Sequence, residues 1–146
     1  MLPDLSSLLN YSHEKVIKSY IRTYSVDDHK ASELFSDMLR YLWISRKHSL
    51  DRKHHPDQEF LKFQLVMHEE MRNIDNMWHN FILYTQDYTQ FCIQYFGEYL
   101  HHMPDVAETM LQTDEEFSMN LERYLSYVYD HLGEETIHRW FSVHLV

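Results

Sequence analysis

The chain has 146 residues, of which 44% are hydrophobic and 15% aromatic, and its formal net charge at pH 7 is −10. The aromatic content excludes an intrinsically disordered chain, because disorder follows from low hydrophobicity, and the acidic balance argues against a duplex nucleic-acid binder, which usually has a basic face. Only 2 glycines are present, where an average chain of this length has about ten, and this scarcity favours helices over glycine-dependent hairpins.

The first residues and the cysteine count bear on the compartment. Met1–Asn10 has no basic residue and too short an apolar core for a signal peptide. Nowhere does an apolar run approach the roughly 20 residues that span a bilayer. Cys92 is the only cysteine, so an intrachain disulfide and a cysteine-rich zinc site are excluded. We expect a soluble, cytoplasmic protein without a membrane span.

The N-terminal third predicts two helices. Ser12 can cap the first, whose apolar residues recur at helical spacing over Val16–Tyr24. Ser25 and Asp28 resemble a capping box for the second. The second helix has a broad apolar face, is expected to be central, and should end near Lys47.

The next segment is polar and then briefly apolar. His48–Asp57 is predicted to be a loop, and the basic cluster Arg46–His55 to be a solvated part of it. This cluster lacks the interleaved aromatic residues that stack on bases. Phe60–Met67 is ambiguous, but its intervening charged and polar residues favour a short helix over a strand.

Two strongly periodic helices follow. The first is expected over residues 73–84, where apolar side chains fit the helical template without a miss. Thr85 can cap the second, which should continue until Pro104 stops it near Met103. The predicted core residues of the two helices are Trp78, Phe81, Phe91, Tyr95 and Phe96.

Two helices are expected at the C-terminal end. Thr113 and Glu116 form a capping box for a helix that Gly133 should close. A short last helix should hold Ile137 and Trp140. Since no linker or repeat divides the chain, we predict one compact all-α domain over residues 1–146, a bundle of about five or six helices.

A metal-site hypothesis comes from Asp75 and His79, which are four residues apart and therefore neighbours on one helix face. His102 would lie on the apolar stripe of the following helix, with His101 near it but pointing elsewhere. Three such N and O ligands suit zinc or non-haem iron. Helix length argues against this hypothesis. A straight second helix would place His102 about 11 Å farther from the turn at Thr85 than Asp75 is, unless that helix bends or ends early near Gly97.

Two alternatives compete with this site. Asp75 and His79 are equally consistent with an ordinary hydrogen-bonded pair. Glu98 with His101, and Glu135 with His138, have the Glu-x-x-His spacing that ferritin-like di-metal bundles use, although that motif needs inward-facing glutamates on two further helices.

The segment Ile74–Pro104 carries the most specific pattern in the chain: an Asp-x-x-Trp-His step, a Tyr-x-x-Phe-Cys step, Phe-Gly and a terminal His-His-x-Pro. The matching positions are Asp75, Trp78, His79, Ile82, Leu83, Thr85, Tyr88, Phe91, Cys92, Phe96, Gly97, His101, His102 and Pro104. This segment resembles the glycine-rich domain-containing-like proteins of bacteria, whose core plant glycine-rich domain proteins share. The chain departs from them at Phe81, where many relatives have a second histidine, and in having no glycine-rich tail.

The resemblance implies a small helical domain without a defined biochemical role. The leading hypothesis is therefore a helical interaction module, because we expect more large aromatics than a small core can bury, and an exposed aromatic surface would bind a partner protein or a second copy. The alternative is a metal-binding domain, enzymatic or not, with zinc or iron held by Asp75, His79 and His102. Whether the chain is an enzyme stays open, since no phosphate loop, nucleophile elbow or zinc-protease motif is present.

Overall fold

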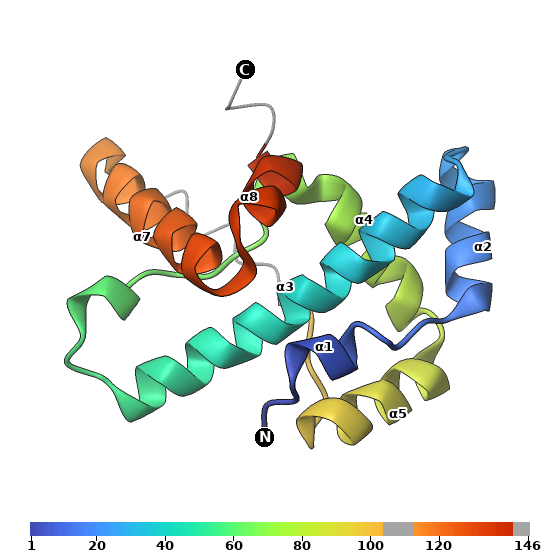
Figure 1. The fold of residues 1–146 in the computed structure, drawn as a ribbon, viewed down its shortest axis with the longest axis horizontal. Coiled ribbons are helices and arrows are strands. Elements are labelled where there is room, and N and C mark those ends of the chain that lie inside the picture. Colours follow the sequence, from blue (N-terminus) through green and yellow to red (C-terminus); the bar gives the residue numbers. More distant parts are fainter. Residues whose placement is uncertain (104–112, 142–146) are drawn as a thin grey trace. The chain divides into compact units, whose positions relative to one another are not determined.

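The structure is a computed structural model that describes residues 1–103 and 113–141, and the fold of these residues is all-α, as predicted (Figure 1). No strand occurs among them. The α-helices are α1 (Leu5–Leu8), α2 (Glu14–Tyr24), α3 (Asp28–His54), α4 (Arg72–Ile82), α5 (Thr85–Phe96), α7 (Asp114–Leu132) and α8 (Glu134–Phe141), with the 3₁₀ turns η1 (Glu59–Leu61) and η2 (Glu69–Met71). Within the described ranges this makes seven α-helices, close to the five or six expected.

The chain divides into two compact units. The first contains Met1–Trp43 and Glu69–Leu100, and the second contains Ile44–His68 and His101–Val146. Helix α3 contributes its residues up to Trp43 to the first unit and the rest to the second. Each unit has a core of its own, and the single domain over residues 1–146 stays a prediction.

The caps of the first helices differ from the expected ones. The residue that caps α2 is His13, whose ring nitrogen Nδ1 accepts a hydrogen bond from the Val16 N–H at 3.2 Å, and not Ser12. The other ring nitrogen of His13 lies 2.7 Å from the Asp87 carboxylate at the start of α5. A histidine at this position was missed because serine is the commoner cap. The short helix α1 also was not predicted, and Asp4 caps it.

Helix α3 is longer than predicted. Its first turn is capped by Asp27, which accepts from the Lys30 N–H at 2.7 Å, whereas Ser25 ends α2 in the left-handed conformation with φ of 54°. The helix continues past Lys47 to His54, so the predicted loop at residues 48–57 is wrong over its first seven positions. Local pairs sustain the added turns, because Lys47 and Asp51 form an i,i+4 ion pair at 3.1 Å.

The segment after α3 forms only the turn η1 and then runs without helix to η2, so a helix over Phe60–Met67 is wrong. Some of its carbonyl oxygens accept hydrogen bonds from side chains of α7. Arg123 donates to the Lys62 carbonyl at 2.8 Å, and Tyr124 donates to the Val66 carbonyl at 2.9 Å. These tertiary contacts override the local helical pattern.

Helix α4 begins and ends close to the predicted bounds, and α5 begins at Thr85. Helix α5 ends at Phe96, however, because Gly97 adopts φ of 78° and terminates it. The predicted continuation to Met103 is wrong for this reason. Pro104, expected to stop the helix, lies outside the described residues.

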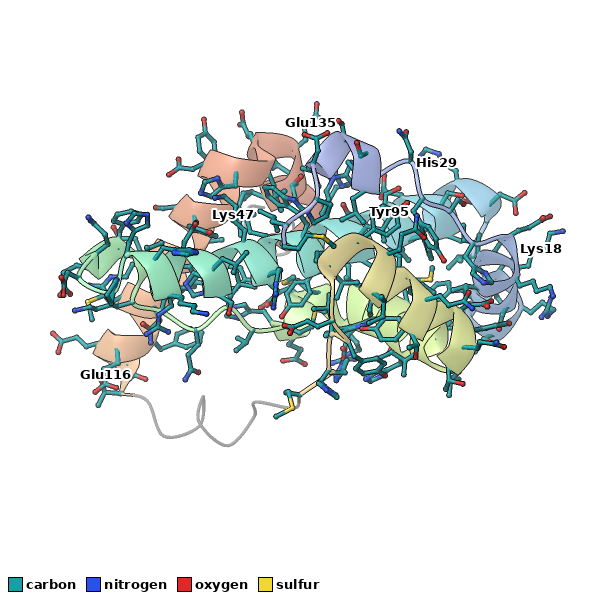
Figure 2. All side chains as sticks on the ribbon, turned by 90° about the horizontal axis from the view of Figure 1, so that it is seen from below. Lys18, His29, Lys47, Tyr95, Glu116 and Glu135 are labelled. Atoms are coloured by element: carbon teal, nitrogen blue, oxygen red, sulfur yellow. The ribbon has the colours of Figure 1, made fainter. Side chains whose placement is uncertain are left out.

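The core of the first unit is aromatic. Trp78, Phe81, Phe91 and Phe96 are buried as predicted, whereas Tyr95 is only half-buried. Tyr95 packs edge-on against Tyr11 with 5.7 Å between ring centroids, on the side of α5 that Figure 2 labels. The Tyr95 ring therefore packs against the aromatic core of the first unit while part of the side chain stays exposed to solvent.

The second unit has a core of aromatic side chains from α7, α8 and the segment after α3, with Thr113 and Gly133 starting and closing α7 as predicted. The Thr113 hydroxyl accepts from the Glu116 N–H at 3.1 Å. The core residues in this unit include Leu61, Phe63, Tyr124, Tyr127, Val128, Trp140 and Phe141. Charged side chains such as Lys18 in the first unit and Glu116 in this one project from the ribbon (Figure 2).

His48 is a buried polar residue within this second core. Its ring lies 4.1 Å from the Phe63 ring, and its Nε2–H donates to the Leu61 carbonyl oxygen at 3.0 Å. Burial lowers the pKa of His48, and the hydrogen bond to Leu61 opposes that change only in part. Burial likewise lowers the pKa of His131. Both imidazoles are therefore neutral in the folded chain near neutral pH.

None of the described helices combines the length and the apolar character that crossing a membrane requires.

Replacing Trp78 by alanine should lower the free energy of unfolding by about 3–5 kcal/mol, because the substitution leaves a large cavity in the aromatic core. Leu83→Ala is the matched control at the end of α4, where the side chain is 76% exposed, and it should change stability by less than about 0.5 kcal/mol. Urea unfolding followed by circular dichroism measures both. Equal losses in the two variants would contradict this packing.

Stability should fall as the pH is lowered from about 7.5 to about 5, since an unfolded histidine protonates near 6.5 while the folded pKa of His48 is lower. Below pH 6.5 the unfolded chain binds more protons, so the stabilising effect is complete above that pH and is lost as the pH falls toward the folded pKa. His48→Gln keeps a hydrogen-bond donor without titrating there and should reduce the fall. His29→Gln, at an exposed position of α3, is the control. The same pH dependence of melting in wild type and His48→Gln would refute the assignment.

Candidate metal centre

Helix α4 positions Asp75 and His79. Ile74, Met77, Trp78 and Phe81 are buried on its apolar face, which fixes the rotation of the helix about its axis. Asp75 and His79 follow one another along the edge of that face. Nε2 of His79 lies 3.8 Å from a carboxylate oxygen of Asp75, and the side chains are 55% and 26% exposed, respectively.

The backbone after α5 is fixed by hydrogen bonds of the Tyr88 hydroxyl group. The Tyr88 hydroxyl accepts a hydrogen bond from the Trp78 indole N–H at 3.0 Å and donates one to the Leu100 carbonyl oxygen at 2.5 Å. Burial raises the pKa of Tyr88, so the hydroxyl keeps the proton that it donates. The Tyr99 ring packs edge-on against Tyr88, with 5.2 Å between ring centroids. The residues after Gly97 leave the end of α5 in a different direction from that of the helix (Figure 1).

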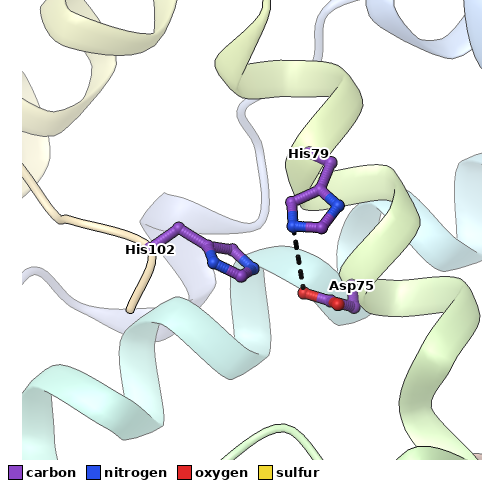
Figure 3. A group of neighbouring side chains, drawn as sticks. All are labelled: Asp75, His79 and His102. Carbon is purple, nitrogen blue, oxygen red and sulfur yellow. Dashed lines mark ion pairs between the residues drawn. The ribbon is translucent and has the colours of Figure 1, made fainter. Parts of the chain in front are cut away.

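His102 follows Leu100 by two residues, so its Cα lies within about 8 Å of the Leu100 Cα. One ligand atom each from Asp75, His79 and His102 lies within 4.8 Å of the others. Figure 3 shows the His102 ring directed toward the Asp75–His79 pair from a segment separate from α4. The early end of α5 at Gly97 removes the difficulty of length that a straight helix would present.

His101 does not join the group; its side chain is exposed. His101 and His102 lie beyond the end of α5 and outside any helix or strand. The structure therefore brings together three of the four sequence-predicted ligands. Whether they bind a metal stays a prediction.

The donor set suits a divalent transition metal. Ligand atoms around a tetrahedral zinc at 2.0–2.2 Å lie about 3.4 Å from one another, so the Asp75–His79 distance of 3.8 Å is nearly short enough. The ligand atoms, which lie within 4.8 Å of one another, would have to approach by up to about 1.4 Å to reach the tetrahedral separation. The imidazoles supply two nitrogens and the carboxylate supplies the negative charge, and two His with one carboxylate is also the ligand set of non-haem iron sites.

The ferritin-like alternative is wrong for the described residues. Glu98 and His101 lie beyond the end of α5, so they do not share a helix face. His138 instead lies 3.5 Å from Glu134 on the exposed side of α8. Glu33 in α3, a glutamate on a further helix, pairs with Lys30 at 3.4 Å.

Sequence reasoning did not find Tyr88 and Leu100 as the residues that place His102. A hydrogen bond between a side chain and a distant carbonyl leaves no periodic signal. Gly97 was the detectable sign, because an isolated glycine at the end of an apolar helical stripe is a common helix terminator.

The fold and the site define an all-α protein with a candidate centre of two histidines and one aspartate. The chain belongs to the UCP032817-like family, whose model matches residues 18–139. No curated protein and no solved structure matches the chain. The resemblance to glycine-rich domain proteins stays a hypothesis beside this family assignment.

Tyr88→Phe should lower the free energy of unfolding by about 1–3 kcal/mol, because it leaves the buried Trp78 N–H without its partner. It should also speed amide exchange over residues 98–103, where the Leu100 carbonyl loses its donor. Tyr95→Phe is the matched control on the same helix, at a half-buried ring. Hydrogen exchange measured by NMR tests both effects. Unchanged exchange over residues 98–103 in Tyr88→Phe would show that another contact holds this segment.

Proposed function

We propose that the chain binds one divalent transition-metal ion, zinc or ferrous iron, through Asp75, His79 and His102. The observation that carries the proposal is the convergence of their ligand atoms within 4.8 Å of one another. The four-residue spacing of Asp75 and His79 explains why these two side chains are close together, because any α-helix makes such residues neighbours. The approach of His102 is independent of helix periodicity, and this independence supports a site over a local pair.

The surroundings also support metal binding. The backbone near each ligand is anchored by buried groups: α4 by its aromatic face, and Leu100 by Tyr88. Preorganised ligands bind a metal more tightly because less conformational entropy is lost on binding. The partial exposure of His79 leaves a path from solvent for the ion.

Three protein ligands leave at least one coordination position open. In zinc sites such a position holds water or a substrate, and a site with four protein ligands is instead typical of a structural role. The proposed centre is therefore suited to binding an exogenous ligand at the metal. Enzymatic turnover is a separate hypothesis.

An interaction module is a second candidate function, and the second unit offers the observation that favours it. Phe60 is 59% exposed and Met119 is 46% exposed, and both line a hollow of about 430 Å³. Many large aromatics are buried, but four are 40–59% exposed: Tyr24, Phe60, Phe117 and Tyr129. Partner binding or self-association through exposed apolar side chains stays a prediction.

Protein purified without a histidine tag should contain close to one zinc or iron per chain by mass spectrometry, or take up one Zn²⁺ in calorimetric titration. His79→Ala and Asp75→Asn should each weaken binding about tenfold or more, because even the loss of a group that only hydrogen-bonds to a ligand costs about 10–100-fold. Binding should also weaken as the pH falls, because protonated ligands do not coordinate.

His138→Ala is the matched control. His138 and Glu134 have the same i,i+4 arrangement and a similar separation of 3.5 Å, but among the described residues no third ligand joins them. This variant should retain wild-type affinity. Absence of stoichiometric metal, or equal losses in His79→Ala and His138→Ala, would reject the centre. Circular dichroism of each variant separates lost ligation from lost folding.

A further inference from the structure

A groove in the second unit lies along the last turns of α3. It has a volume of about 590 Å³ and is lined by Ser45, His48, Ser49, Arg52, Lys53 and the residues Phe63–Val66. This volume falls within the range of small-molecule sites. All of its lining residues belong to the second unit, and none is a metal-site residue.

The electrostatics of the groove oppose those of the whole chain. The chain has 23 acidic residues against 13 lysines and arginines, yet among the described residues no acidic side chain lines the groove, and two cationic ones do. Within the part of the chain that the structure describes, neither Arg52 nor Lys53 forms an ion pair with a carboxylate. The described part of the chain therefore leaves the positive charge of the groove without an opposing carboxylate in an ion pair.

The wall and floor of the groove have different chemistry. Ser45, Ser49 and Lys53 recur every four residues and thus lie along one face of α3, over about 12 Å. Arg52 donates to the Phe63 carbonyl at 3.5 Å, which holds the guanidinium at the groove edge. Phe63 also lines the groove, and its ring lies against that of His48, with centroids 4.1 Å apart and an interplanar angle of 32°. Because burial keeps His48 neutral, Arg52 and Lys53 carry the charge.

Basic residues in the last turn of a helix also have a local role, since they interact favourably with its C-terminal carbonyl groups. That role does not account for two serine hydroxyls and an aromatic floor in the same groove. An elongated ligand with an anionic group at one end satisfies all of these features together.

We propose that this groove binds a small organic anion, with a carboxylate or phosphate group at Arg52 and Lys53 and an apolar body along Phe63–Val66. The hydroxyl groups of Ser45 and Ser49 offer hydrogen bonds along the length of the ligand. The proposal is independent of the metal centre, which lies on other elements.

The fluorescent probe 8-anilinonaphthalene-1-sulfonate has this chemistry, and N-phenyl-1-naphthylamine has the same rings without the sulfonate. The full chain should bind the anionic probe with a saturable increase in fluorescence, and the neutral one about tenfold or more weakly. Lys53→Gln should weaken binding of the anionic probe several-fold, and binding should weaken between about 50 mM and about 500 mM NaCl because salt screens the interaction.

Ser49→Glu places a carboxylate in the groove at an exposed helical position, where folding is not at risk. It should weaken binding of the anionic probe about tenfold or more, because like charges repel. Ser32→Glu makes the same change at an exposed position earlier in α3 and should leave binding unchanged. Competition by benzoate and by phenyl phosphate then distinguishes the two anionic groups.

Absence of saturable binding would overturn the proposal. Equal affinity in wild type and Ser49→Glu would overturn it as well, because it would place the probe elsewhere. Equal affinity for the anionic and neutral probes would show that charge has no part in recognition and would also overturn it. Melting curves of each variant confirm that the compared proteins are folded.

Discussion

The geometry of the candidate metal centre depends on one hydroxyl group. Tyr88 joins α4 to the segment after α5, because its oxygen accepts from Trp78 on one helix and donates to the Leu100 carbonyl. Each end of this pair of hydrogen bonds is buried or half-buried, where an unpaired polar group costs free energy. The direction of the chain beyond Gly97, and with it the position of His102, follows from satisfying those groups.

The sequence predicted well the parts of the fold that depend on local periodicity. Helix α4 and the start of α7 follow directly from an apolar stripe and from a threonine cap. The failures have tertiary causes. The turns of α3 beyond Lys47 look like a loop by composition, but His48 is buried against Phe63 and Asp51 accepts a hydrogen bond from the Tyr127 hydroxyl at 2.6 Å. Those partners lie elsewhere in the sequence and leave no periodic signal.

The site was predictable in its residues but not in its geometry. Spacing alone made Asp75 and His79 neighbours, and the histidine pair after α5 was a visible candidate. His102 can approach Asp75 and His79 only because the helix ends at Gly97. From the sequence, this glycine competes with an apolar pattern that continues the helix to Met103, and local pattern does not decide between them. The helical stripe favoured His102 over His101, but that reasoning assumed a helix through both residues, whereas α5 ends at Phe96 and the backbone after Gly97 places His102.

The five-residue step from Gly97 to His102 imposes a length requirement on the chain. One residue of extended backbone advances the chain by about 3.5 Å. Adding or removing one residue would therefore displace His102 by more than the length of a metal–nitrogen bond, which is near 2.0 Å. An insertion or deletion between Gly97 and Leu100 would thus move His102 out of range, or leave the Leu100 carbonyl away from Tyr88. The connection between His54 and Glu59 has no such constraint, because its residues are exposed. Variation in chain length among natural homologues should consequently be allowed at the second connection and absent from the first.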